Sequence, residues 1–239
     1  EVYRARIEAI DAGFELPLTY NRYVRSYIHV YTVKKRDLAN RILGKKETFF
    51  PLFEQILEKH GLPKELKYLA IQESALRTDA VSRAGATGLW QLMKGTAREL
   101  GLTVTSFLDE RRDPYKATDA AVRYLKRLHN KYGDWMLVIA AYNCGPGNVN
   151  KAIRRSGNKR NFWTIRKYLP RETRDYVPAY IACVYWTTHY QDHNLHPDYP
   201  IYPLAFNNTT TIKVSGTIDL NEMSRALYLD PDKMAFINP

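Results

Sequence analysis

The sequence predicts a mainly helical fold. Apolar residues recur at helical spacing from residue 20 to about residue 190, and almost no alternating strand pattern occurs before residue 205. The segment 134–143 is apolar on nearly every side, which is typical of a helix in the middle of a bundle. A length of 239 residues with 45% hydrophobic residues suffices for one sizeable domain, alone or with a small appendage.

Capping and stop residues divide the helical region into segments. Asn21 is placed to cap the first helix, Gly44 and Gly61 supply stops, and Asp113-Pro114 supplies a start. Asp175 is expected to cap the last long helix, headed by Tyr176. The expected helices cover residues 22–33, 35–43, 47–60, 64–74, 91–100, 115–131, 134–143, 147–155, 161–168 and 172–191.

The chain divides into four expected parts. Residues 1–20 are predicted to be an extended segment, and residues 21–192 form the helical domain. Residues 193–208 are rich in Pro and Tyr, which is typical of an extended linker. Residues 209–239 are predicted to be a small β-α-α unit, with a strand at 209–215 and helices at 219–227 and 230–236.

Composition narrows the class of partner. No run of about 18 apolar residues occurs, so no membrane-spanning helix is expected. The net charge of +11 favours an acidic partner such as nucleic acid, anionic lipid or an anionic wall polymer, although a solvated surface explains the same charge. The 18 Tyr and 4 Trp are compatible with stacking on sugars or bases. Nucleic-acid binding is disfavoured because the sequence has no helix-turn-helix, RNP or zinc signature.

Neither cysteine nor histidine spacing predicts a metal site. Cys144 and Cys183 are too few for a disulfide framework and are expected as buried apolar residues, with a single bridge left open. His189, His193 and His196 share a helical spacing, but His196 precedes a proline, where a helix has usually ended. No metal and no cofactor are therefore expected.

Glu73 is the candidate catalytic residue. It shares a helical stripe with Leu66, Leu69 and Ala70, a position that Glu rarely takes without a partner or a purpose. Burial and a helix C-terminus both disfavour its ionised form, and a carboxylic acid that is neutral near pH 7 suits general acid catalysis. A structural Glu satisfied by an arginine or by backbone amides is the alternative.

Three further sites carry polar or aromatic groups. Gly88-Leu-Trp90-Gln91 is an aromatic-bearing turn, typical of those that line a sugar cleft. Tyr142-Asn143 ends the apolar helix beside a Gly-Pro-Gly turn, where Asn143 either caps the helix or binds a ligand amide. Tyr176 either packs in the core or faces the site.

Several blocks in the same order and spacing resemble the lytic transglycosylases of the soluble-lytic-transglycosylase (SLT) type over residues 60–190. The blocks are Ile71-Gln-Glu73-Ser74, Ser82-Arg-Ala-Gly85-Ala-Thr-Gly88-Leu-Trp90-Gln91-Leu-Met93, Asp113-Pro114-x-Lys116-Ala117, Gly133-Asp134-Trp135, Ala141-Tyr142-Asn143-x-Gly145-x-Gly147 and Glu172-Thr173-x2-Tyr176-Val177. The N-terminal helices and the C-terminal unit most resemble the membrane-bound transglycosylase D branch, with residues 209–239 similar to a divergent, truncated LysM repeat.

This resemblance implies a lysozyme-like domain of the goose-lysozyme/SLT type at residues 21–192. It implies cleavage of the MurNAc–GlcNAc β-1,4 bond of peptidoglycan to 1,6-anhydro-MurNAc ends, with Glu73 as acid and then base. Trp90 stands where the family usually has Met. The implied substrate-binding residues are Ser74, Ser82, Gln91, Met93, Tyr142, Asn143 and Tyr176.

The resemblance also implies a setting and leaves alternatives. The expected partner is the peptidoglycan glycan strand, acted on by a monomer in the bacterial cell envelope. The periplasm is the expected compartment, with attachment to the outer membrane through a lipid anchor outside this chain. A goose-type lysozyme that hydrolyses the same bond, or a non-catalytic glycan-binding protein, stays open.

Overall fold

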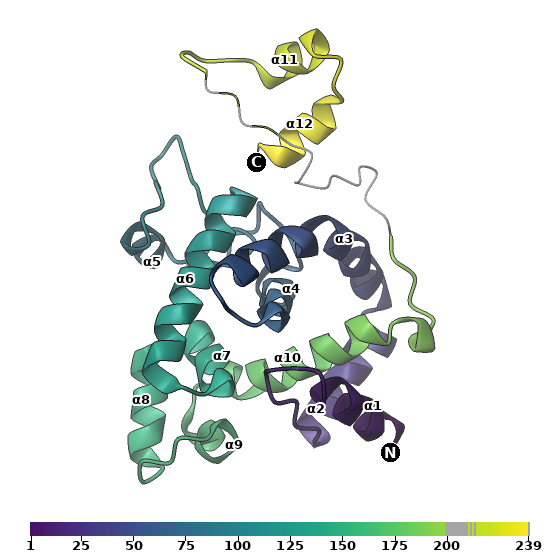
Figure 1. Cartoon of the computed structure of the whole chain (residues 1–239), viewed down its shortest axis with the longest axis vertical. Helices are drawn as coiled ribbons and strands as arrows, with labels where there is room; N and C mark the ends of the chain where they lie inside the picture. The colour runs from purple at the N-terminus through teal and green to yellow at the C-terminus, as the bar shows by residue number, and fades with distance from the viewer. Residues whose placement is uncertain (199–209, 211, 213, 239) are drawn as a thin grey trace.

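A computed structural model describes residues 1–198, 210, 212 and 214–238 of the chain, and it confirms the mainly helical prediction (Figure 1). Within these residues, β pairing is limited to the isolated bridges Val81–Thr87, Thr87–Leu92 and Val104–Asp109. None of the described helices has the length and apolar character needed to cross a bilayer. The α-helices are α1 (Val2–Asp11), α2 (Arg22–His29), α3 (Arg36–Lys59), α4 (Leu69–Ser74), α5 (Lys94–Glu99), α6 (Pro114–Tyr132), α7 (Trp135–Cys144), α8 (Pro146–Arg155), α9 (Phe162–Ile165), α10 (Arg171–Thr188), α11 (Leu220–Ala226) and α12 (Pro231–Ile237).

Helix α7 lies at the centre of the helical body, as its composition predicts. It packs against α6, α8 and α10 (Figure 1), and every residue of 136–141 is buried. Asp134 caps its first turn, accepting a hydrogen bond of 2.8 Å from the backbone N–H of Leu137. The helix ends at Gly145, whose φ of 79° suits glycine. The sequence thus delivers Tyr142 and Asn143 from the core to a turn.

Two predictions in the N-terminal part are wrong. Residues 2–11 of the expected extended segment form α1, which buries Ile7. Arg6 of this helix lies 3.2 Å from Asp192 and 3.2 Å from the hydroxyl of Tyr185, so α1 is held near the C-terminal end of α10. Gly44 does not end a helix, because α3 continues through it as a single helix of 24 residues. Gly44 is buried within α3, so packing outweighs its intrinsic cost of about 1 kcal/mol.

Helix α10 begins at Arg171, one residue before the predicted start at residue 172. Its N-cap is Pro170 and not Asp175, and Pro178 lies inside the helix. A proline removes one helical hydrogen bond, leaving free the carbonyl four residues before it, here that of Arg174. Arg166 Nε donates to this carbonyl at 2.7 Å, and its Nη2 donates to Asp175 at 2.9 Å. One arginine therefore satisfies both groups and lets the helix run on past its proline.

The expected helix over 91–100 is also shorter than predicted. Gln91 adopts a left-handed φ of 47°, and the backbones of Thr87 and Leu92 exchange hydrogen bonds of 3.2 Å. These features hold residues 80–92 as a compact loop, so that α5 covers only Lys94–Glu99.

The C-terminal unit contains the two predicted helices. α11 and α12 pack on each other and are capped by Asp219 and Asp230. The predicted strand at 209–215 includes residues 209, 211 and 213, which lie outside the described residues, as does residue 239. Residues 199–208 of the predicted linker lie outside them too, and the domain boundaries stay predictions.

Candidate functional site

Glu73 lies one residue before the end of the short helix α4, which packs against α10. Ala75 and Leu76 both have left-handed backbones, with φ of 53° and 58°, and they end the helix abruptly. Glu73 is therefore held on a rigid support next to the loop of residues 80–92. The residue is half-buried, so one part of it is open to the outside.

Tyr176 from α10 is the hydrogen-bond partner of Glu73. Its hydroxyl donates to Glu73 Oε1. The pKa of Glu73 is raised to about 7, because burial disfavours its charge and outweighs the Tyr176 hydrogen bond, which acts to lower it. The negative charge of Glu172 raises this pKa further. No arginine or lysine in the described part of the chain bonds to Glu73, so an ion pair does not hold it ionised.

Tyr142 from α7 belongs to the same cluster. Burial, together with the nearby charge of Glu73, raises its pKa well above the ordinary value for tyrosine. The same two causes raise the pKa of Tyr176. Both phenols are therefore neutral hydrogen-bond donors near pH 7, and Tyr142 donates to the backbone carbonyl of Trp90 at 2.7 Å.

Asn143 has a fixed orientation beside this cluster. Its Oδ1 accepts a hydrogen bond of 2.8 Å from the hydroxyl of Thr173, which is buried in α10. With the oxygen engaged, the Asn143 amide nitrogen has no partner among the described residues and presents donors. Donors of this kind suit the carbonyl of a ligand amide.

The loop after α4 carries Ser82, Gln91 and Met93. The backbone N–H of Ala86 donates to the Ser82 hydroxyl at 3.0 Å, and Ser82 is half-buried. The Gln91 amide donates to the carbonyls of Ala80 and Gly88 at 3.1 and 2.9 Å. Met93 is 46% exposed. These residues share one loop, whereas the contact network around Glu73 comprises Tyr176, Tyr142 and Glu172.

Ser74 and Trp90 are engaged within the protein. The Ser74 hydroxyl donates to Leu89 O at 2.9 Å and accepts from Arg77 N–H at 3.1 Å, which joins the end of α4 to the loop. Trp90 is fully buried, so its indole does not line a sugar cleft as the sequence suggested. Instead its Nε1 donates to Thr118 on α6 at 2.8 Å, and its ring meets Phe53 edge-on at 5.1 Å.

Arg111 supports the loop of residues 80–92, a role that the sequence of the chain does not indicate. The side chain is buried and pairs with Asp109 at 2.7 Å. Its Nη1 donates to the carbonyls of Gly85 and Leu92 at 2.9 and 3.0 Å. Gly88 lies against its backbone, because a Cβ added there would meet the Arg111 carbonyl oxygen at 1.9 Å.

Glu172 is the acidic neighbour that sequence reasoning missed, although it begins the block that contains Tyr176. It is exposed at the start of α10, and its charge acts on Glu73. Asp79, the carboxylate nearest to the motif in sequence, is instead bound by Arg77 through two hydrogen bonds of 3.1 Å, which lower its pKa. Asp79 therefore stays ionised and cannot donate a proton near pH 7.

The cysteines and histidines considered in the sequence analysis are not part of the contact network around Glu73. Cys144 and Cys183 are both free thiols, half-buried and buried respectively, so no bridge joins them. His189 pairs with Asp192 at 2.9 Å beyond the end of α10. No group of metal-ligating side chains is found in the part of the chain that the structure describes.

Comparison with known proteins confirms the resemblance read from the sequence. Residues 51–164 match the family described as the Transglycosylase SLT domain. Membrane-bound lytic murein transglycosylase D of Escherichia coli K12 is 38% identical over 167 residues, which cover 67% of this chain and 34% of that protein. Soluble lytic murein transglycosylase of the same strain is 28% identical over 157 residues, covering 61% of this chain and 24% of that protein.

Solved structures agree with the sequence match. The crystal structure of the 70-kDa soluble lytic transglycosylase from Escherichia coli superposes with a TM-score of 0.51 at 26% identity, covering 62% of this chain and 25% of that one. The chain thus spans about a third of the curated transglycosylase D and about a quarter of the soluble enzymes.

Proposed function

We propose, from the premise that residues 51–164 belong to the Transglycosylase SLT domain family, that this chain cleaves the β-1,4 bond between MurNAc and GlcNAc in peptidoglycan. The observation that carries the proposal is Glu73, a half-buried acid with a pKa raised to about 7 and no cationic partner among the described residues. A group with this pKa can both give and take a proton near neutral pH.

The proposed reaction uses Glu73 twice and consumes no water. Glu73 first gives its proton to the glycosidic oxygen, and the bond from MurNAc C1 to that oxygen breaks. The 2-acetamido oxygen of the same MurNAc attacks C1, which gives an oxazolinium intermediate. Ionised Glu73 then takes the proton of the C6 hydroxyl, O6 attacks C1, and the bond from C1 to the acetamido oxygen breaks. The product is 1,6-anhydro-MurNAc, and Glu73 is protonated again.

Internal attack needs the acetamido group and the C6 hydroxyl to be held close to C1. We assign the acetamido group to the free amide donors of Asn143, which Thr173 orients. Tyr176 orients Glu73. We assign Ser82, Gln91 and Met93 to the loop side of the proposed substrate cleft. Tyr142 and Ser74 fix that loop from the protein side, through the carbonyls of Trp90 and Leu89.

Hydrolysis of the same bond is the second candidate, and Glu172 is the observation that favours it. Glycosidases that use water need a second carboxylate to activate it. Glu172 is exposed and its charge acts on Glu73. If Glu172 activates a water, the new MurNAc end gains one water molecule and is heavier than the anhydro end by the mass of that molecule.

Digestion of purified sacculi with mass analysis of the products tests both candidates. We expect anhydro ends from the natural chain and a loss of about 100-fold or more for Glu73→Gln, because general acid–base catalysis contributes factors of this size. Glu58→Gln is the matched control, since Glu58 is an exposed glutamate paired with Lys64. Wild-type rates for Glu73→Gln would overturn the proposal, and hydrated ends would establish hydrolysis instead.

The setting is proposed on the same premise. We assign the chain to the bacterial cell envelope, acting as a monomer on peptidoglycan strands in the periplasm, attached to the outer membrane through a lipid anchor outside this chain. Residues 209–239 would be a divergent LysM-like unit, supported by the paired helices α11 and α12.

A further inference from the structure

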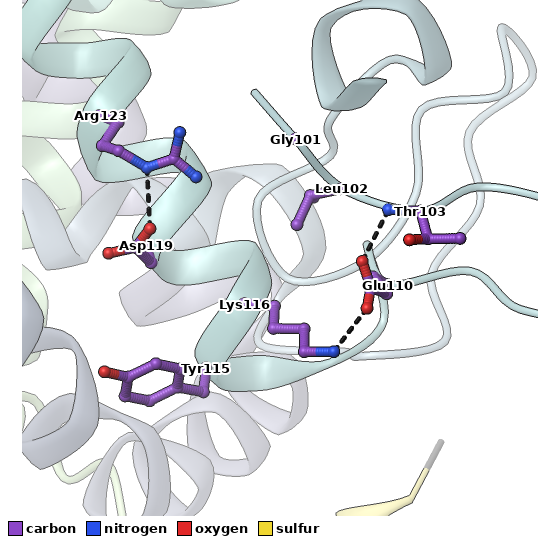
Figure 2. A pocket seen from close by; sticks show the side chains of 8 residues that line it. All are labelled: Gly101, Leu102, Thr103, Glu110, Tyr115, Lys116, Asp119 and Arg123. Atoms are coloured by element: carbon purple, nitrogen blue, oxygen red, sulfur yellow. Dashed lines mark hydrogen bonds and ion pairs between the residues drawn. The ribbon is translucent and has the colours of Figure 1, made fainter. Parts of the chain in front are cut away.

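A pocket of about 380 Å³ lies between α6 and the segment that precedes it, and it includes none of the residues assigned to cleavage. Figure 2 shows Arg123, Asp119, Lys116 and Tyr115 along α6, with Thr103 and Glu110 facing them from residues 101–110. Its size is in the range of sites for small ligands. The pocket faces outward, whereas Thr118 on the same helix points inward to Trp90.

The charges in this pocket cancel one another. Glu110 accepts hydrogen bonds from Lys116 Nζ and, at 2.6 Å, from the backbone N–H of Thr103. Asp119 accepts a hydrogen bond of 2.8 Å from Arg123 Nε, and its other carboxylate oxygen lies 2.8 Å from His60 Nε2. Two carboxylates thus face two permanent cations, in a chain whose net charge is +11. A charged ligand would have to displace one of these pairs, whereas a neutral ligand would not.

Hydrogen-bonding capacity nevertheless remains. No group among the described residues bonds to the hydroxyl of Tyr115 or to Nη1 of Arg123, and Lys116 keeps two further N–H donors, whereas the Thr103 side chain already bonds to Glu110. Each carboxylate oxygen has a second lone pair. Tyr115, which lines the pocket (Figure 2), is 50% exposed, and its ring offers an apolar face.

We propose that this pocket binds a neutral saccharide unit, with the Tyr115 ring against one sugar face and Arg123 and Glu110 bonded to hydroxyl or acetamido groups. A sugar needs both an apolar platform and mixed donors and acceptors, and it needs no uncompensated charge. The proposal rests on the proposed function for the identity of the polymer, an N-acetylated glycan. The pocket would hold a glycan strand at a second point, remote from the bond being cleaved.

The test is an NMR titration of the full chain bearing Glu73→Gln with the β-1,4-linked tetramer of N-acetylglucosamine. We expect the backbone amides of Gly101, Thr103 and Lys116 to shift as one group. Adding Tyr115→Ala should weaken this binding about five- to tenfold, the loss expected for one aromatic contact. Phe107→Ala is the matched control, because Phe107 is 99% exposed on the adjacent loop but does not line the pocket.

Three outcomes would overturn the proposal. Shifts confined to the surroundings of Glu73 would show that the pocket binds no sugar, and equal effects of Tyr115→Ala and Phe107→Ala would remove the assigned platform. A site that loses the tetramer in about 0.5 M NaCl and with Lys116→Gln would be charge-dependent instead. The titration uses the Glu73→Gln chain and needs no cleavage, so failure of the pocket and failure of the proposed reaction are distinguishable.

Discussion

The pKa of Glu73 is set by burial and by two neighbouring side chains, whose effects oppose one another. Burial and the charge of Glu172 raise its pKa, whereas the hydrogen bond from Tyr176 lowers it. The acid form does the first step, so the rate should fall as pH rises through about 7. The alkaline limb of the pH profile of kcat/KM therefore reports this pKa.

Two substitutions should move that limb in opposite directions. Glu172→Gln removes a negative charge, so Glu73 ionises more easily and the limb moves to lower pH. Tyr176→Phe removes the bond that stabilises the ionised form, so the limb moves to higher pH, and the rate falls about ten- to hundredfold with the lost hydrogen bond to a charged group. The measurement is kcat/KM on sacculi over a pH series. An alkaline limb that does not move to lower pH in Glu172→Gln would show that Glu172 does not act through its charge, and one that does not move to higher pH in Tyr176→Phe would show the same of the Tyr176 hydrogen bond.

Sequence reasoning finds the acid at this scale but not all that surrounds it. Glu73 stands out because a carboxylate on an apolar stripe conflicts with burial, and Tyr142 and Asn143 because they end an apolar helix. The prediction for Trp90 is wrong, because an aromatic residue beside glycines is equally compatible with an exposed ring that binds sugar and with a ring buried in the core. Glu172 and Arg111 cannot be found from spacing, because their effects depend on tertiary contacts across about 100 and 20 residues.

At the scale of the element, the loop of residues 80–92 depends on a close backbone contact. Gly88 and Gly85 both have φ of +83°, but only Gly88 lies against other atoms, those of Arg111. Gly88→Ala should therefore lower the free energy of unfolding by about 3 kcal/mol or more, through backbone strain and the clash together. Gly85→Ala should cost about 1 kcal/mol, through strain alone. Urea unfolding measures both, and equal losses would show that the contact with Arg111 is not what selects glycine.

The helices show which local signals decide an element. Asn21 and Asp113 cap helices as predicted, because an Asx side chain bonds the first turn whatever lies around it. Gly44 does not end a helix, because its burial within α3 outweighs its low helix propensity. Pro178 does not end α10, because Arg166 bonds to the Arg174 carbonyl that the proline leaves free. Propensity is a weak prior where tertiary packing opposes it. Asp175 fails as a start signal and Gly61 holds as a stop signal, so a signal of either kind is decided by the contacts around it.

At the scale of the whole molecule, the half-buried Glu73 should lower the stability of the fold at the pH where it acts. The folded pKa of about 7 lies above the ordinary 4.5, so the folded state binds this proton more tightly than the unfolded state does. The resulting stability is complete below about pH 4.5 and is lost as pH rises through about 7. Glu73→Gln keeps an acceptor for the Tyr176 hydroxyl but carries no charge at any pH.

We therefore expect Glu73→Gln to be more stable than the natural chain at about pH 8, by about 1–3 kcal/mol, and nearly equal to it at about pH 4. Urea unfolding of both proteins at the two pH values measures this difference. Glu65→Gln, at a glutamate that lies just before α4, serves as the control and should show no such rise. An equal gap at both pH values would mean that Glu73 titrates like an exposed carboxylate, and a group of that kind would already be ionised near pH 7 and unable to protonate the glycosidic oxygen.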